Sequence, residues 1–142
     1  LFGWVLTTTR LTEAGAEALL QLTNNKYIIL LLINVLLLIV GCFLEPIASI
    51  SILVPVLMPI ILKVGIHPVH FGVVMTLNLM IGLLHPPLGM VLFVLSRIAK
   101  LSIERTTMAI LPWLIPLMMS LIAITLIPEL TLWLPRTMGM LK

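Results

Sequence analysis

The sequence has 142 residues, of which 61% are hydrophobic and only 9% are charged. A soluble domain carries roughly 25% charged residues, so this composition indicates an integral membrane protein. The single cysteine, Cys42, excludes an internal disulfide and a cysteine-based metal cluster. The net charge of +3 comes from scattered lysines and arginines, which suit loops beside a lipid bilayer, and the absence of a basic run argues against nucleic-acid binding.

Residues 1–26 are predicted to contain the end of a transmembrane helix followed by an interfacial helix. Residues 1–10 read as the last turns of a helix whose start is missing, which suggests the C-terminal part of something longer. Residues 11–22 are good helix formers, with Thr12 as N-cap and Glu13 in the first turn. Their apolar residues share one face, so we expect a helix at the membrane interface or a connector packed on protein.

Residues 27–63 are predicted to form a re-entrant helical hairpin. Two apolar arms, 27–40 and 47–62, flank the segment GCFLEP. Each arm has about 14 or 16 residues and reaches roughly 21–24 Å, which is less than the ~30 Å hydrocarbon core. The Glu45-Pro46 pair favours a bend, because a residue before proline is displaced from helical geometry. Two tilted spanning helices joined by a tight turn are the alternative.

Residues 64–96 are predicted to form a loop and then a discontinuous transmembrane helix. The apolar block 71–96 is long enough to span a membrane, but the segment GLLHPPLG interrupts it. The prolines Pro86 and Pro87 supply no N–H, so carbonyls near residues 82–84 are expected to lose their helical partners. In a membrane, unwound backbone is tolerated only against protein or a polar cavity.

Residues 97–142 are predicted to form a cytoplasmic loop and a final transmembrane helix. The stretch 97–106 carries three basic residues against one acid, so the positive-inside rule places it in the cytoplasm. The apolar block 109–134 then crosses back. In the loop before the broken helix, His67 and His70 have a spacing that could hold a metal, but without a third ligand nearby they read as polar loop residues.

Polar residues inside the apolar blocks mark the candidate functional positions. Glu45 is the one acid in a membrane block, which indicates function unless it lies at a wet hairpin tip. Ser49 and Asn78 could each supply a side-chain oxygen, or could serve helix packing and interhelical hydrogen bonding instead. A hairpin tip facing a broken helix would form a cation site from backbone oxygen. The sequence contains no HExxH motif, nucleophile elbow or phosphate loop, so we expect no enzyme activity.

Three ordered segments resemble one transporter family: GCFLEPIASISILVPVLMPI, GIHPVHFGVVMTLNLMIGLLHPPLG and LIPELTLWLP. They are similar to the C-terminal portion of the large membrane subunit (DctM-like) of TRAP transporters, the tripartite ATP-independent periplasmic family. The resemblance implies an all-α integral membrane fold with a re-entrant hairpin and a discontinuous transmembrane helix. It also implies that these elements form one repeat of an inverted-repeat, elevator-type transporter.

The resemblance implies the C-terminal part of a large permease that imports organic anions, such as C4-dicarboxylates, sialic acid or other sugar acids. Na⁺ is the implied coupling ion, with no other cofactor. The implied partners are a periplasmic substrate-binding protein, a small four-helix membrane subunit and the missing N-terminal part of the large subunit. The implied location is the bacterial inner membrane, with several spans. A non-transporting membrane scaffold, such as a degenerate paralogue, is the alternative.

By resemblance, one Na⁺ site lies between the hairpin turn and the proline break. The residues that match the family's ion-site motif are Gly41 of the hairpin, and Gly82, His85 and Leu88 of the break. Glu45, Ser49, Asn78, Pro86 and Pro87 are expected in the vicinity of the substrate or the ion.

Two positions depart from the family pattern. The family usually has threonine where this chain has His85, and a neutral imidazole nitrogen is a poor ligand for hard Na⁺. The backbone carbonyl at this position survives any substitution, so the site is expected to be weakened, or to respond to pH, without being lost. Glu45 replaces a typical aspartate, which is the milder change.

Overall fold

The computed structural model describes residues 25–86 and 89–140, and these residues form helices joined by short turns. The helices are α3 (Lys26–Phe43), α4 (Pro46–Lys63), α5 (Pro68–Gly82), α6 (Met90–Ala99), α7 (Ile103–Leu126) and α8 (Glu129–Thr137). Three of them, α3, α4 and α7, are long and apolar enough to cross a membrane. The predicted all-α membrane class is therefore confirmed. The helices predicted within residues 1–24 lie outside the described residues.

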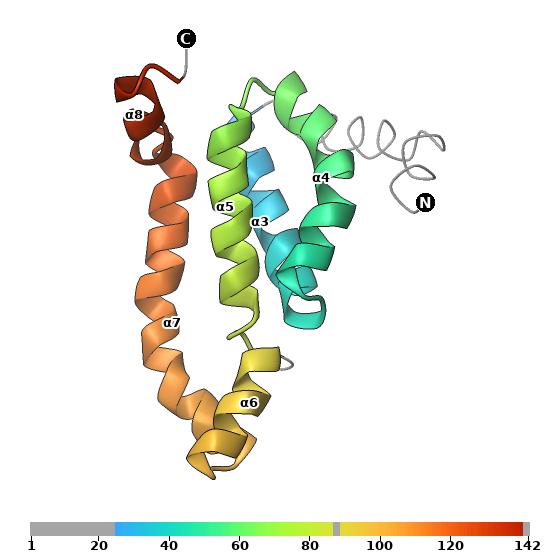
Figure 1. Cartoon of the computed structure of the whole chain (residues 1–142), viewed down its shortest axis with the longest axis vertical. Helices are drawn as coiled ribbons and strands as arrows, with labels where there is room; N and C mark the ends of the chain where they lie inside the picture. Colours follow the sequence, from blue (N-terminus) through green and yellow to red (C-terminus); the bar gives the residue numbers. More distant parts are fainter. Residues whose placement is uncertain (1–24, 87–88, 141–142) are drawn as a thin grey trace.

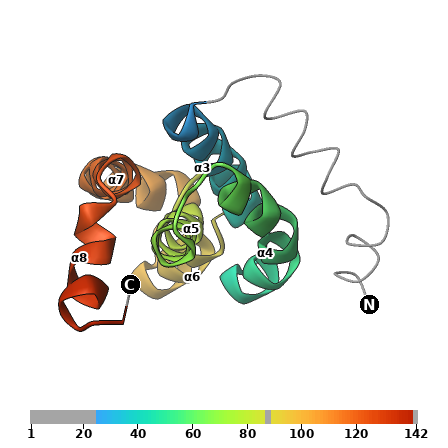
Figure 2. The same ribbon diagram turned by 90° about the horizontal axis from the view of Figure 1, so that it is seen from above.

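Helix α5 is the centre of the bundle. Figure 1 and Figure 2 show α3 and α4 on one side of α5 and α7 on the other, and α5 contacts all three. One apolar cluster joins α5 to α3 and α4 through side chains such as Phe71, Leu37 and Ile61. A second cluster joins α5 to α7 through side chains such as Val74 and Leu121. This arrangement places the C-terminal ends of α3 and α5 close together (Figure 1).

Helices α3 and α4 form the predicted helical hairpin, but both are longer than predicted. Each has 18 residues and is roughly 27 Å long. Helix α3 continues into the predicted turn as far as Phe43, and Pro46 occupies the first position of α4, where a helix needs no N–H donor. Glu45 has the extended backbone expected before proline, with φ −65° and ψ 141°. The turn therefore needs only two residues between the helices.

The predicted discontinuity between α5 and α6 is confirmed, whereas the predicted loop before it is too long. Gly65, with φ +74°, follows the end of α4, and α5 already begins at Pro68. His67 caps α5, because its Nδ1 accepts a hydrogen bond from Val69 N at 3.2 Å. The prediction that His70 is a polar loop residue is wrong. Its side chain is 1% exposed on α5, because a proline at the first helical position starts the helix earlier than the apolar pattern does.

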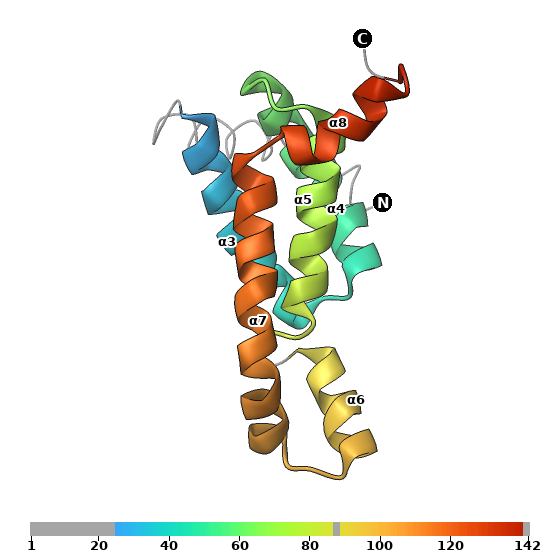
Figure 3. The same ribbon diagram turned by 90° about the vertical axis from the view of Figure 1, so that its left-hand side faces the viewer.

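The predicted final helix over residues 109–134 is wrong in its bounds. Helix α7 begins at Ile103, where Ser102 accepts a hydrogen bond from Arg105 N at 3.4 Å, and ends at Leu126. Ile127 has φ −115° and ψ 86°, since the following Pro128 disfavours a helical conformation there. Helix α8 then crosses the end of the bundle at an angle to α7 (Figure 3). The loop that was predicted over residues 97–106 is shorter in the structure, because α6 runs to Ala99 and α7 begins at Ile103.

Candidate functional site

The ends of α3 and α5 meet at two glycines. A Cβ atom placed on Gly82 would lie 2.8 Å from both the Cα and the carbonyl carbon of Gly41. A Cβ atom placed on Gly41 would lie 3.2 Å from Gly82 Cα and from the Leu79 carbonyl oxygen. Only glycine allows two backbones to approach so closely. We call this contact between the hairpin and the broken helix the glycine junction.

The break after α5 retains backbone hydrogen bonds of its own. His85 N donates to Gly82 O at 3.1 Å, Gly89 N donates to His85 O at 3.2 Å, and Val91 N donates to Leu83 O at 3.3 Å. The carbonyls of Gly82 and Leu83 were predicted to lose their partners, but each accepts one hydrogen bond. A carbonyl oxygen has two lone pairs, so each can still offer one to a cation.

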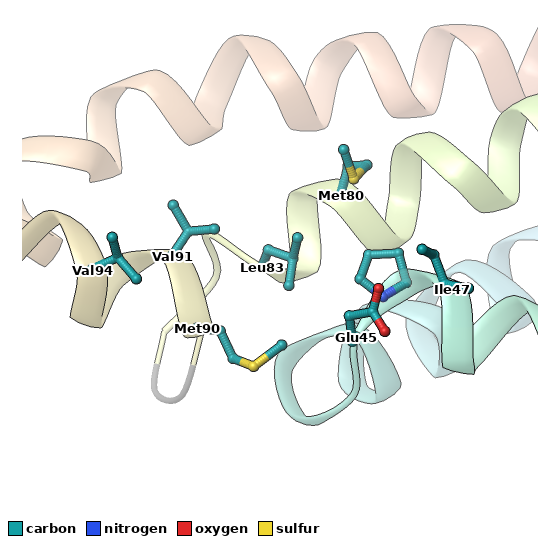
Figure 4. Close-up of a pocket in the computed structure, with 8 residues that line it drawn as sticks. Glu45, Ile47, Met80, Leu83, Met90, Val91 and Val94 are labelled. Atoms are coloured by element: carbon teal, nitrogen blue, oxygen red, sulfur yellow. The ribbon is translucent and has the colours of Figure 1, made fainter.

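The tip of the hairpin and the start of α6 enclose a hollow of about 400 Å³ (Figure 4). Glu45 is exposed there, and the side chain of Met90, at the start of α6, extends toward it. The other lining side chains are apolar: Pro46, Ile47, Met80, Leu83, Val91 and Val94. Among the described residues, no lysine or arginine lines this hollow. Its one formal charge is therefore the negative charge of Glu45.

His85 lines a different hollow, of about 330 Å³, together with Cys42 and Pro86. The thiol of Cys42 donates to the carbonyl oxygen of His85, with 3.8 Å between sulfur and oxygen. The Nδ1 atom of His85 is buried and has no hydrogen-bond partner within residues 25–86 and 89–140. The imidazole of His85 and the carboxylate of Glu45 thus line separate hollows, although their backbones both belong to the turns around the glycine junction.

The two remaining polar candidates are already engaged in hydrogen bonds. Ser49 is fully buried, and its hydroxyl donates to the carbonyl of Glu45 within the same turn at 3.0 Å. Asn78 is also fully buried, and its Nδ2 donates to Asn34 O at 3.0 Å and to Asn34 Oδ1 at 2.9 Å. The interhelical alternative for Asn78 is therefore the one that the structure shows. Pro87 and Leu88 lie outside the described residues.

Two buried polar residues were missed in the sequence analysis. Asn34 on α3 and Thr125 on α7 are 5% and 0% exposed, and they are hydrogen-bonded to each other. An amide inside the apolar block 27–40 is a visible signal, of the same kind as Asn78. Thr125 gives a weaker signal, because threonine is common in membrane helices. In the described part of the chain, no group of three histidine, cysteine or acidic residues could hold a metal, which leaves His67 and His70 without a third ligand.

Comparison with known proteins points to one family. The family profile described as the tripartite ATP-independent periplasmic transporter, DctM component, matches residues 1–130. The chain is 44% identical over 136 residues to the sialic acid TRAP transporter large permease protein SiaM of Vibrio cholerae, covering 96% of this chain and 32% of that protein.

Two further relatives transport other acids according to their names. The chain is 50% identical over 125 residues to the isethionate TRAP transporter permease protein DctMQ of Oleidesulfovibrio alaskensis, covering 88% of this chain and 20% of that protein. It is 42% identical over 140 residues to the C4-dicarboxylate TRAP transporter large permease protein DctM of Pseudomonas aeruginosa, covering 99% of this chain and 33% of that protein. The chain thus spans about a third or less of the length of these relatives.

Proposed function

This chain belongs to the DctM family of tripartite ATP-independent periplasmic transporters, and we propose that it forms the C-terminal part of a Na⁺-coupled large permease for an organic anion. The named substrates of the three relatives are sialic acid, isethionate and C4-dicarboxylates. All are acids, which supports an organic anion as the substrate class. The relatives are permeases and not enzymes, in agreement with the expected lack of enzyme activity.

The glycine junction is the observation that carries this proposal. It brings together the C-terminal ends of α3 and α5, and such ends carry partial negative charge from unpaired carbonyls. Half-helix C-terminal ends and unwound carbonyls are the usual Na⁺ ligands of secondary transporters. We place the ion at the carbonyls of Gly41, Gly82 and His85, where it would replace the weak thiol donor of Cys42 on the His85 oxygen.

The role of His85 in this proposal is limited to its backbone. Its carbonyl accepts bonds from Gly89 N and from the thiol of Cys42, while its imidazole lines the hollow beside Cys42. Replacement of the family's threonine by histidine would therefore remove a hydroxyl ligand and retain the carbonyl ligand. This supports a site of reduced Na⁺ affinity.

We place the substrate carboxylate in the hollow of Figure 4, where α4 and α6 begin. Helix N-termini attract anions, and both of these N-termini line the hollow. The carboxylate of Glu45 opposes this attraction. A bound Na⁺ would offset that repulsion, so the anion would bind well only after the cation. Such an order couples the two solutes without any contact between them.

The same assignment extends to the membrane arrangement. At 18 residues each, α3 and α4 are long enough to cross a membrane, so the re-entrant hairpin that we propose rests on the family resemblance and not on arm length. We place this hairpin in one of two inverted repeats of an elevator-type transporter in the bacterial inner membrane. Its partners would be the rest of the large subunit, a small four-helix membrane subunit and a periplasmic substrate-binding protein.

Uptake by the whole system tests the proposal. The permease that contains this chain is reconstituted in proteoliposomes with the small subunit and the cognate binding protein. Labelled sialic acid, isethionate and succinate are supplied with and without an inward Na⁺ gradient. We expect uptake of one of these acids to depend on Na⁺. Uptake that is unchanged without Na⁺ would overturn the coupling ion, and no uptake of any organic anion would favour the scaffold alternative.

A further inference from the structure

Three buried polar side chains join helices α3, α5 and α7. Asn34 on α3, Asn78 on α5 and Thr125 on α7 are 5%, 0% and 0% exposed. We call them the polar triad. They lie among apolar side chains, where an unpaired polar group is costly, so their mutual hydrogen bonds constrain how the helices pack.

The hydrogen bonds of the polar triad run in one direction. Asn78 Nδ2 donates to Asn34 Oδ1 at 2.9 Å, Asn34 Nδ2 donates to Thr125 Oγ1 at 2.8 Å, and Thr125 Oγ1 donates to Leu121 O at 2.7 Å. Asn78 Nδ2 also donates to Asn34 O at 3.0 Å. Reversing the amide of Asn78 would point its oxygen at two oxygens of Asn34. The observed orientation is therefore the one that this chain of donors permits, and it leaves Asn78 Oδ1 buried without a partner among the described residues.

Asn34 and Asn78 of the polar triad lie in the same helix interface as the glycine junction. Asn78 is about one turn before Gly82 on α5, and Asn34 is about two turns before Gly41 on α3. Apolar contacts between α3 and α5 are not directional, so they allow one helix to rotate or slide against the other. The hydrogen bonds between Asn78 and Asn34 specify one rotation of α3 about its axis relative to α5, and one position along that axis. At the junction, small changes in either would separate the two glycines.

We infer that the polar triad is a positioning device for the glycine junction. It fixes α3 on α5 so that Gly41 and Gly82 meet, and it thereby sets the geometry of the carbonyls around them. Asn78 acts here through Asn34, and both hydrogens of its amide are used for this purpose. The consequence for cation affinity rests on the proposed function, whereas the consequence for geometry does not.

Thr125 offers the sharpest test, because it belongs to α7 and contributes nothing to the junction itself. T125V keeps the shape of the side chain and removes the acceptor of Asn34 Nδ2. T125S retains the hydroxyl. S120A is the matched control on the same helix, since the hydroxyl of Ser120 bonds to Pro116 O of its own helix at 2.8 Å. The variants are made in a whole permease in which Cys42 is the only cysteine.

The first measurement is the rate at which a small methanethiosulfonate reagent modifies Cys42 in the absence of Na⁺. Cys42 is 5% exposed and adjoins Gly41, so its reaction reports the opening of the junction. Loss of one buried hydrogen bond is worth ~1.4 kcal/mol, or about tenfold. We expect Cys42 to react about tenfold faster in T125V than in the parent protein. In T125S and S120A, its rate should stay within about twofold of the parent rate. An unchanged rate in T125V would overturn the inference.

The second measurement is the Na⁺ concentration that half-saturates uptake. We expect this concentration to rise in T125V and to return toward the parent value in T125S. A parent permease without Na⁺ dependence would overturn the proposed coupling ion, while the Cys42 rates would still decide the positioning role. Should T125V accumulate poorly, N34S breaks the same chain of hydrogen bonds with a smaller side chain and is read in the same way.

Discussion

Gly82 packs against Gly41 so closely that a Cβ atom on Gly82 would lie 2.8 Å from the Gly41 backbone. This contact joins the end of a helical hairpin to the end of a broken helix. Because it is a contact of backbone with backbone, no side-chain rotation can relieve a substitution. The glycine junction is therefore both a backbone-to-backbone packing constraint and the place where carbonyl groups of two helix ends converge.

G82A is expected to force α3 and α5 apart. Overpacking of this kind costs ~1–3 kcal/mol, and the misplaced carbonyls should reduce Na⁺-dependent uptake by at least about tenfold. G72A is the matched control on the same helix, because a Cβ atom there meets nothing within 4 Å. Thermal unfolding and uptake are measured for both variants. Equal behaviour of G82A and G72A would contradict a functional junction.

E45Q is expected to lower the apparent affinity for Na⁺ in uptake. The substitution removes the one formal charge that lines the hollow of Figure 4 and keeps the size of the side chain. Because Glu45 is exposed, we expect a several-fold rise in the half-saturating Na⁺ concentration and not a complete loss. E45D should behave like the parent. E104Q serves as the control for removing an exposed carboxylate elsewhere; if it had the same effect as E45Q, the result would reflect net charge and not the hollow.

H85T is expected to raise the apparent affinity for Na⁺. Threonine would add a hydroxyl oxygen beside a carbonyl that is already present, and it would remove an imidazole whose Nδ1 atom is buried without a partner in the described residues. A gain of about threefold to tenfold corresponds to one additional hydrogen-bonding or ligand contact of modest strength. The half-saturating Na⁺ concentration is measured for H85T and for H67T, a control outside the junction. Unchanged or lower affinity in H85T would mean that the imidazole does not weaken the site.

The hairpin and the broken helix could be predicted because their causes are local. Proline after Glu45, and the adjacent prolines and glycines after Gly82, limit backbone conformation wherever the chain goes. Composition likewise sufficed for the membrane class. Boundaries were less accurate, since the apolar pattern continues across Pro128 even though the helix does not.

Long-range pairings could not be predicted. Nothing in the sequence indicates that Asn78 bonds to Asn34, or that Asn34 bonds to Thr125, because these partners meet only when three helices pack. His70 was misplaced for a local reason, because Pro68 starts α5 earlier than the apolar pattern does, but its long-range pairing could not be predicted either. Its partner, Thr131, lies on α8, and the sequence pattern gave no separate helix there. A lone polar residue in an apolar block indicates a partner without saying which one.

T131V is expected to loosen the attachment of α8 to α5. Thr131 Oγ1 donates to Pro128 O at 2.9 Å, so its contact with His70 Nδ1 at 2.8 Å requires the imidazole to be the donor. Loss of this acceptor leaves a buried N–H unpaired, which costs ~1–3 kcal/mol. T137V is the matched control on α8, because the hydroxyl of Thr137 bonds to Leu134 O within the same helix at 2.8 Å. Thermal unfolding of the purified permease should show a lower midpoint temperature for T131V. For T137V, the free energy of unfolding should change by no more than about 0.5 kcal/mol. Equal midpoints for the two variants would mean that apolar packing alone holds α8 in place.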